Sequence, residues 1–251
     1  MSEKSYGLEN LSLIPGSVGA APIQNIGAYG VEIKDLCSKV FVLNLDSMER
    51  ETLSNSQCQF SYRESVFKKS THKKKYVILA VEFKLSTRFS PVLEYPALKS
   101  IVEQTLDDEG KDLLPKTLAQ IVIDMRNSKL PDPSEIPNAG SFFKNPVVDS
   151  LLFVELQKKY PTIPSFSIAT DDGRESDKLK IPAAWLIDQC GWKGKYLNKV
   201  GVHEHQALVI VNPEYQNVSS VLELAETIKK DVLAKFTIEL QVEPQQLYER
   251  S

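Results

Sequence analysis

The sequence predicts an α+β protein. Two early stretches, residues 39–45 and 75–85, are rich in β-branched and aromatic residues, which is typical of strands. Two later stretches, residues 116–128 and 219–236, repeat apolar residues three and four positions apart, which predicts amphipathic helices. Together these patterns indicate a mixed α+β chain whose two units are joined near residues 130–138.

The composition is that of an ordinary globular protein. The 251 residues are enough for a large core, and 42% are hydrophobic and 25% charged. The net charge of -3 argues against a nucleic-acid binder, which normally carries a basic excess. The longest apolar runs are strand-sized, and the first ten residues lack the apolar core of a secretory signal. We therefore expect a soluble, cytoplasmic protein with no membrane partner.

The cysteines and histidines give no sign of a metal site. Cys37, Cys58 and Cys190 are widely spaced and form no CxxC pair, which suits a reducing cytosol. His203 and His205 would share one face of a strand, and we interpret them as a surface pair. No metal is expected.

The first segment, residues 6–30, is rich in glycine, alanine and proline. Its small residues at positions 16, 17 and 19–21 leave backbone amides unshielded, as a loop that binds phosphate or a ring requires. A tightly packed turn is the alternative. The segment matches neither GxGxxG after a strand nor a P-loop, so neither nucleotide motif applies.

Two basic residues have open interpretations. Arg63 in "SYRES" is either a surface charge or a fixed guanidinium aimed at a carboxylate. Lys129 follows the helix predicted at residues 116–128, whose apolar face would be Leu118, Ile121, Val122 and Met125. This lysine either binds an anion or complements the helix dipole. The three prolines that follow in "KLPDPSEIPNAG" predict a boundary.

The second half of the chain predicts three further helices and two strands. The helices are expected at residues 148–160, within residues 181–194 up to Gly191 or Gly194, and at residues 219–236; the strands are expected at residues 206–212 and 237–244. For the last helix, Ser220 and Glu223 predict a capping box. Its expected apolar face is Val221, Leu224, Ala225, Ile228 and Val232.

The stretch "AGSFFKNPVV" sets a hydroxyl between a glycine and two phenylalanines. Gly-Ser and Asn-Pro favour a turn, whereas Phe-Phe favours burial. Ser141 is therefore either a turn residue over a core or a proton donor in a pocket.

Several stretches occur in an order that resembles one known family. They are "GLENLSLIPGSVGAAPIQNIGAYG", "FSYRESVF", "SKLPDP", "NAGSFFKNP", "AAWLIDQCGWKG" and "HQALVIVN". Together they resemble the UDP-N-acetylenolpyruvoylglucosamine reductases, in the longer form that has an extra tyrosine loop. The resemblance runs from Gly7 over nearly the whole chain, and "IQNIGAYG" and "GSFFKNP" are its specific motifs.

The resemblance implies an FAD-dependent oxidoreductase of peptidoglycan precursor synthesis. NADPH would reduce FAD, and hydride would pass to the vinyl carbon of UDP-N-acetylglucosamine enolpyruvate. A proton would then reach the adjacent carbon and give UDP-N-acetylmuramate. The flavin carries the hydride chemistry, while the protein orients it and tunes its charge. The serine of "GSFF" is the family's proton donor, which implies that role for Ser141.

The resemblance also implies the other site residues. Arg63 and Glu243 would join Ser141 in catalysis, with Glu239 as the neighbouring alternative to Glu243. The expected substrate-binding residues are Tyr95, Lys129, Asn145 and Gln206. The expected cofactor-binding residues are Gly16, Ser17, Gly19, Ile26, Gly27 and Ala28.

The implied domains are parts of a flavin unit and a substrate domain. Residues 1–130 would be the second lobe of a PCMH-type FAD-binding unit, residues 131–235 the substrate-binding C-terminal domain, and residues 236–251 a strand returning to the FAD domain. Family members begin with a first lobe whose glycine-rich loop holds the FAD pyrophosphate, and no stretch here matches it. We therefore expect weak or no FAD binding unless a separate chain supplies that lobe. A non-catalytic UDP-sugar-binding remnant without flavin is the alternative.

Overall fold

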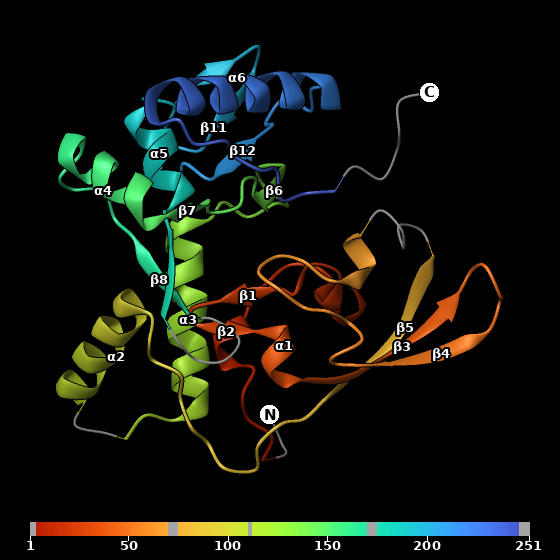
Figure 1. Cartoon of the computed structure of the whole chain (residues 1–251). Helices are drawn as coiled ribbons and strands as arrows, with labels where there is room; N and C mark the ends of the chain where they lie inside the picture. Colours follow the sequence, from red (N-terminus) through yellow and green to blue (C-terminus); the bar gives the residue numbers. More distant parts are fainter. Residues whose placement is uncertain (1–3, 70–74, 110–111, 170–174, 246–251) are drawn as a thin grey trace. The chain divides into compact units, whose positions relative to one another are not determined.

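The computed structural model describes residues 4–69, 75–109, 112–169 and 175–245. The fold is α+β, as the sequence predicts, and every sheet is antiparallel (Figure 1). The chain divides between Ser128 and Lys129 into two compact units, which we describe separately. In the described part of the chain, no helix is long and apolar enough to cross a membrane.

The first unit begins with irregular and 3-10 structure and continues into a small sheet. Its early elements are η1 (Glu9–Leu11), η2 (Val18–Gln24), β1 (Gly27–Ala28), β2 (Val31–Glu32), α1 (Ile33–Leu36), β3 (Cys37–Asn44), β4 (Arg50–Ser54), η3 (Val66–Lys68) and β5 (Tyr76–Phe83). The strands β3 and β5 confirm the two predicted strands. The sheet order is β4-β3-β5, and Val40 and Val42 of the central strand are fully buried. Their burial fixes which face of the sheet covers the core.

A two-residue turn joins β1 to β2. Tyr29 and Gly30 both have positive φ, 50° and 89°. Positive φ at both central positions is the geometry of a tight hairpin whose twist matches its strands. The side-chain amide of Asn10 donates to the carbonyl oxygen of Tyr29 at 2.8 Å and holds the turn in place.

Two helices complete the first unit. They are α2 (Pro96–Glu109) and α3 (Pro115–Lys129). The buried residues of α3 are the predicted ones: Leu118, Ile121, Val122 and Met125. These residues form one cluster with Leu98 and Val102 of α2.

In its described residues, the second unit contains two sheets and three helices. Its elements are β6 (Asn138–Ser141), β7 (Val147–Asp149), α4 (Ser150–Lys159), β8 (Phe166–Ala169), β9 (Glu175–Lys180), α5 (Ala183–Gln189), β10 (Tyr196–Leu197), β11 (Val200–Val202), β12 (Val209–Val211) and α6 (Val218–Phe236). The sheet orders are β10-β11-β12-β6 and β7-β9-β8. The three predicted helices and the strand predicted within residues 206–212 are thereby confirmed.

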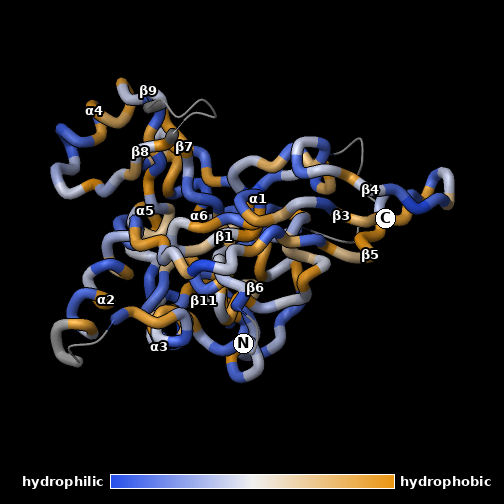
Figure 2. The backbone as a smooth tube through the Cα atoms, turned by 90° about the horizontal axis from the view of Figure 1, so that it is seen from below, coloured by the Kyte–Doolittle hydropathy of each residue, from blue (hydrophilic) through white to orange (hydrophobic). Residues whose placement is uncertain are grey.

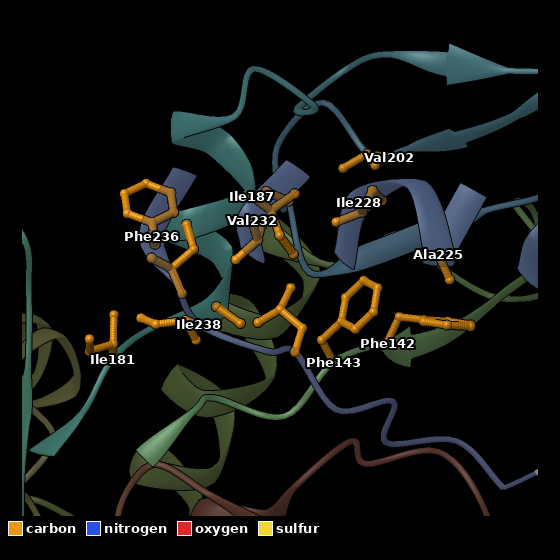
Figure 3. Packing of buried hydrophobic residues seen from close by; sticks show 14 of the residues in the cluster. Phe142, Phe143, Ile181, Ile187, Val202, Ala225, Ile228, Val232, Phe236 and Ile238 are labelled. Carbon is orange, nitrogen blue, oxygen red and sulfur yellow. The ribbon is translucent and has the colours of Figure 1, made fainter. Parts of the chain in front are cut away.

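The core of the second unit lies between α6 and the β10-β11-β12-β6 sheet. Figure 3 shows Phe142 and Phe143 beside Ala225 and Ile228, and all four belong to one buried cluster. The rings of Phe142 and Phe143 meet edge to face, with centroids 5.3 Å apart. Not every apolar residue is covered: Leu151 of α4 is 81% exposed. Figure 2 shows orange, hydrophobic segments beside the α4 label.

Two predictions for the last segments are wrong. The cap of α6 is Asn217, whose side chain accepts from the backbone N–H of Ser220, so Ser220 and Glu223 form no capping box. The strand predicted at residues 237–244 is only an isolated bridge between Phe143 and Val242. Thr237 adopts a left-handed conformation, with φ of 59°, and ends the helix. Beyond Thr237 the described chain pairs with residues 142–144 through this one bridge.

Candidate functional site

Ser141 lies at the end of β6, opposite Val209 of β12. Its side chain is exposed, whereas Phe142 and Phe143 are 6% and 1% exposed. Gly140 adopts a φ of 69°, and no atom lies within 4 Å of the position a Cβ would take there. The core therefore anchors the two phenylalanines while the hydroxyl stays open to a ligand.

The C-terminal segment lies alongside the serine motif. The backbone N–H of Glu243 donates to the carbonyl oxygen of Phe142 at 2.9 Å, and the N–H of Lys144 donates to Gln241 at 2.9 Å. These bonds flank the bridge between Phe143 and Val242. The structure thus brings Glu243 to the residue that follows Ser141.

Asn145 has a structural contact of its own. Its Oδ1 accepts from the backbone N–H of Ala183 at 2.9 Å, which is the first residue of α5. The first N–H groups of a helix lack partners within the helix, so Asn145 satisfies one of them. Its Nδ2 group is the part of the side chain that a substrate could use.

Gln206 and Lys129 complete the expected substrate residues of the second unit. Gln206 lies in the turn before β12, and its Oε1 accepts from the N–H of Leu208 at 3.3 Å. The carbonyl of Leu208 in turn accepts from the N–H of Phe142 at 2.7 Å, which links this turn to the serine motif. Lys129 is the exposed last residue of α3.

In the first unit, Arg63 reaches the glycine-rich segment. Its Nη2 donates to the carbonyl oxygen of Gly27 at 2.8 Å, and its guanidinium lies 5.3 Å from the ring centroid of Tyr62. A Cβ on Gly27 would lie 2.8 Å from Cγ of Glu32 and 2.9 Å from the carbonyl oxygen of Val31. Glycine is therefore required at position 27, and its carbonyl orients Arg63.

The remaining cofactor candidates lie in three places: Gly16 and Ser17 precede η2, Gly19 lies within η2, and Ile26 and Ala28 lie just before and within β1. Gly16 has a φ of 108° with open space around it, and Ser17 beside it is exposed. Leu13 and Val18 flank them and are 50% and 60% exposed. Bare backbone between exposed apolar side chains suits a flat apolar ring that also needs hydrogen bonds. These residues therefore fit a flavin ring.

Sequence reasoning missed the residue that holds this segment together. Asn25 is fully buried and its side chain makes three hydrogen bonds. Its Nδ2 donates to Glu32 at 2.8 Å and to the carbonyl of Ser61 at 3.0 Å, and its Oδ1 accepts from the N–H of Lys34 at 2.9 Å. In the sequence, Asn25 is only a polar residue between Gln24 and Ile26. That pattern does not distinguish a buried anchor from a surface residue.

Tyr95 stacks against the turn of the β1–β2 hairpin. Its ring meets the ring of Tyr29 edge to face, with centroids 5.3 Å apart and planes at 82°. Burial raises the pKa of the Tyr29 hydroxyl, and the nearby Arg126 partly opposes that shift. Both tyrosines pack against the cluster formed by α2 and α3.

His203 and His205 have ring centroids 5.5 Å apart. Partial burial lowers the pKa of His203, and the neighbouring His205 lowers it further. Among the residues that the structure describes, no group of three or more potential ligands could hold a metal ion.

Comparison with known families identifies a domain in the second half of the chain. The family described as "UDP-N-acetylenolpyruvoylglucosamine reductase, C-terminal domain" matches residues 132–247. That range contains both Ser141 and Glu243. The class defined by this match is a reductase domain.

Curated relatives match nearly the whole chain. The UDP-N-acetylenolpyruvoylglucosamine reductase of Pasteurella multocida is 49% identical over 95% of this chain and 66% of its own length. That of Bdellovibrio bacteriovorus is 46% identical over 97% of this chain and 69% of its own length. The chain therefore belongs to the UDP-N-acetylenolpyruvoylglucosamine reductase family and spans about two thirds of these relatives.

A solved structure supports the fold. The crystal structure of UDP-N-acetylenolpyruvylglucosamine reductase from Thermus caldophilus covers 96% of this chain with a TM-score of 0.59 and 22% identity. The chain covers 64% of that structure's length. At this identity the likeness concerns the fold alone.

Proposed function

We propose that this chain functions in the NADPH-dependent, FAD-mediated reduction of UDP-N-acetylglucosamine enolpyruvate to UDP-N-acetylmuramate, in the cytoplasmic synthesis of peptidoglycan precursors. Family membership supports the reaction. The observation that carries the proposal within the structure is the hydrogen bond between the N–H of Glu243 and the carbonyl of Phe142, because it joins the segments of two expected catalytic residues.

Ser141 is the proposed proton donor to the carbon next to the reduced vinyl carbon. A serine hydroxyl is a weak acid, so it serves only a strongly basic carbon in a site that the bound ligand closes to water. Its exposure leaves room for that ligand. We assign Glu243 the task of returning a proton to Ser141 after each turnover.

Arg63 is the proposed source of positive charge for the enolate that forms during reduction. A fixed guanidinium stabilises developing negative charge without reorganising when the reaction occurs. The 2.8 Å bond to Gly27 supplies that fixed orientation. Tyr95, Lys129, Asn145 and Gln206 are the proposed residues for the sugar and phosphates.

The proposed flavin-facing surface consists of Gly16 and Ser17 before η2, Gly19 within η2, and Ile26, Gly27 and Ala28 at β1. The flavin, when bound, supplies hydride transfer from NADPH to the substrate. The chain's own contribution is bare backbone at Gly16 and a rigid hairpin that begins at Gly27.

The test is a visible absorption spectrum of the purified chain after incubation with FAD and desalting. The chain alone should retain little or no flavin, whereas the chain with the first lobe supplied by a separate chain should retain a flavin spectrum and show NADPH oxidation that depends on the enolpyruvyl substrate. A chain with retained flavin but no substrate-dependent oxidation would contradict the proposal.

A second candidate function is the binding of a UDP-sugar without flavin chemistry. Three of the four proposed substrate residues, together with Ser141, belong to the second unit, whereas the proposed flavin surface belongs to the first. Calorimetric titration of flavin-free chain with UDP-N-acetylglucosamine enolpyruvate tests this candidate. Heat-silent mixing would reject it.

A further inference from the structure

Lys68 is a buried lysine whose ammonium group lies against the backbone of Arg63. Its side chain is only 7% exposed. Its Nζ donates to the carbonyl oxygen of Arg63 at 3.1 Å and lies 4.0 Å from Oε1 of Glu64. Lysine side chains are rarely buried to this extent, because an ammonium group withdrawn from water loses its hydration. The burial therefore indicates that the contact with Arg63 is specific.

Arg63 stands in a turn that needs support from outside. Ser61 and Glu64 exchange two backbone hydrogen bonds of 3.1 and 3.0 Å, so Tyr62 and Arg63 are the central residues of a tight turn. Arg63 adopts a φ of 54°, a left-handed conformation that is unfavourable for a residue with a Cβ. The bond from Lys68 opposes relaxation of this conformation, because a rotated carbonyl would lose the ammonium group.

The short helix η3 holds Lys68 in place. Ser65, which precedes η3, is fully buried; its Oγ donates to the carbonyl oxygen of Ile23 and accepts from the N–H of Phe67 at 3.2 Å. The N–H of Lys68 donates to the carbonyl oxygen of Ser65 at 3.1 Å. Lys68 is therefore fixed by a segment that is itself anchored to the chain before β1.

The orientation of the Arg63 side chain depends on this backbone. Its Nη2 donates to the carbonyl oxygen of Gly27 at 2.8 Å. The side chain starts from the Cα whose conformation Lys68 holds, so a change of backbone angles at Arg63 would move the guanidinium away from Gly27. Lys68 and Gly27 thus hold the backbone and the guanidinium of the same residue.

We propose that Lys68 is a positioning residue of the reductase, which acts through the carbonyl oxygen of Arg63 and keeps the Arg63 guanidinium aimed at the charge that forms during reduction. This inference rests on the proposed function, because it takes Arg63 as the source of positive charge. A cation contributes most to a reaction when it is already oriented before the charge develops. Lys68 adds a residue outside the expected catalytic, substrate and cofactor sets.

The first experiment follows the Arg63 side chain directly, by nuclear magnetic resonance of arginine Nε–H groups in the flavin-free chain. The wild-type signal is assigned by its loss in Arg63→Lys. Lys68→Met keeps an unbranched stem and removes the ammonium group. We expect it to move the Arg63 signal toward the position of a solvent-exposed guanidinium.

Lys69→Met is the matched control. Lys69 is the next residue, is exposed, and donates through its Nζ to Oε1 of Gln59 on the surface. Its substitution should leave the Arg63 signal where it is in the wild type. A merely structural Lys68 would lower the unfolding temperature and leave the Arg63 signal of the folded protein unchanged.

The second experiment measures turnover in assemblies of these variants that retain FAD, with the first lobe supplied by a separate chain. Lys68→Met should lower kcat about 10- to 100-fold, because a small displacement of a catalytic group is enough for such a loss. KM for the enolpyruvyl substrate should change little, since Arg63 acts on charge that develops only in the transition state. Lys68→Arg keeps an N–H donor and a charge and should restore part of kcat.

Two results would overturn the inference: an unchanged Arg63 signal in folded Lys68→Met, or an unchanged kcat in its flavin-loaded assembly. Should Lys68→Met fail to fold, Lys68→Gln provides the same two measurements, with smaller expected changes because its amide donor is one bond shorter. Wild-type values in Lys68→Gln would then overturn the inference. An inactive wild-type assembly would contradict the proposed function instead, whereas the Arg63 signal needs no flavin and still decides whether Lys68 orients Arg63.

Discussion

The backbone N–H of Glu243 donates a hydrogen bond of 2.9 Å to the carbonyl oxygen of Phe142. Phe142 follows Ser141, and its ring is anchored in the core of the second unit. The contact uses main-chain atoms, so substitution of either side chain leaves it in place. The hydrogen bond joins the segment that carries Glu243 to the segment that carries Ser141. A site keeps its geometry when its residues are held in this way by rigid elements.

Asn145→Asp should separate folding from ligand binding. Aspartate keeps an oxygen that accepts from the N–H of Ala183, and a negative charge near the start of α5 is favourable. The substitution also replaces the amide donor with a charge that repels phosphate. We expect an unchanged unfolding temperature and at least about tenfold weaker UDP binding by calorimetry.

Asn145→Ala is the matched comparison. It removes the acceptor as well, so it should lower the free energy of unfolding by about 1 kcal/mol. Equal UDP affinity in Asn145→Asp and the wild type would refute a substrate role for the amide.

Asn25→Ala should destabilise the first unit strongly. It leaves the N–H of Lys34 without its acceptor, whereas the carbonyl of Ser61 still accepts from the N–H of Glu64 at 3.0 Å. An unpaired polar group costs about 1–3 kcal/mol, so we expect urea denaturation to show a loss of about 2 kcal/mol in the free energy of unfolding.

Asn198→Ala provides the control for Asn25→Ala. Asn198 also has a positive φ, 49° against 45° for Asn25, but it is exposed and its side chain makes one bond of 3.4 Å. Its substitution should cost well under about 1 kcal/mol. Equal losses in the two variants would mean that backbone conformation, not the buried bonds, accounts for the effect.

Gly27→Ala should disturb both the hairpin and Arg63. The new Cβ would lie 2.9 Å from the carbonyl oxygen of Val31, which is backbone and cannot turn aside. We expect a loss of about 1–3 kcal/mol in the free energy of unfolding. Gly19→Ala is the control, because the nearest atoms there lie 3.9 Å away. A Gly27→Ala variant as stable as Gly19→Ala would contradict the close packing at Gly27.

Stability should fall in alkaline solution because of Cys58. Burial raises the pKa of its thiol from 9.0 to about 12, with a smaller contribution from Cys37. Between these values the folded state keeps a proton that the unfolded state has lost. The stabilising contribution is therefore complete below pH 9 and lost as the pH rises toward 12, by about 1.4 kcal/mol per pH unit at most.

Urea denaturation at about pH 8 and about pH 10 measures this effect. Cys58→Ala removes the titrating group and should lessen the loss of stability between the two conditions, although it lowers stability at both by leaving a small cavity. An equal pH dependence in Cys58→Ala and the wild type would exclude Cys58 as the cause.

Periodic sequence patterns predicted the regular elements well. The face of α3 was predicted residue by residue because burial repeats with the period of the helix. The N-cap of α6 was predicted wrongly because Asn217, Ser219 and Ser220 are all good capping residues. The sequence pattern does not say which of the three stands immediately before the first helical residue. The last strand was predicted from alternation, and alternate residues such as Ile238 and Leu240 are indeed buried. Alternation does not reveal whether a neighbouring strand is present to form a ladder of backbone hydrogen bonds with this segment.

The sequence predicted the residues of the site only through their resemblance to the family. The resemblance indicated Ser141 and Glu243, and the structure adds the backbone contact that joins their segments. The roles of Asn25 and Asn145 as anchors could not be predicted, because their partners lie up to 38 residues away in the sequence.

The most direct test of the proposed function compares the two half-reactions in the wild type and Ser141→Ala, in preparations that retain FAD. We expect NADPH to bleach the flavin absorbance equally in both proteins. The enolpyruvyl substrate should restore the absorbance and sustain turnover only in the wild type, because only that protein can protonate the product carbon. Turnover by Ser141→Ala at the wild-type rate, or loss of both half-reactions, would contradict the assignment of Ser141 as the proton donor.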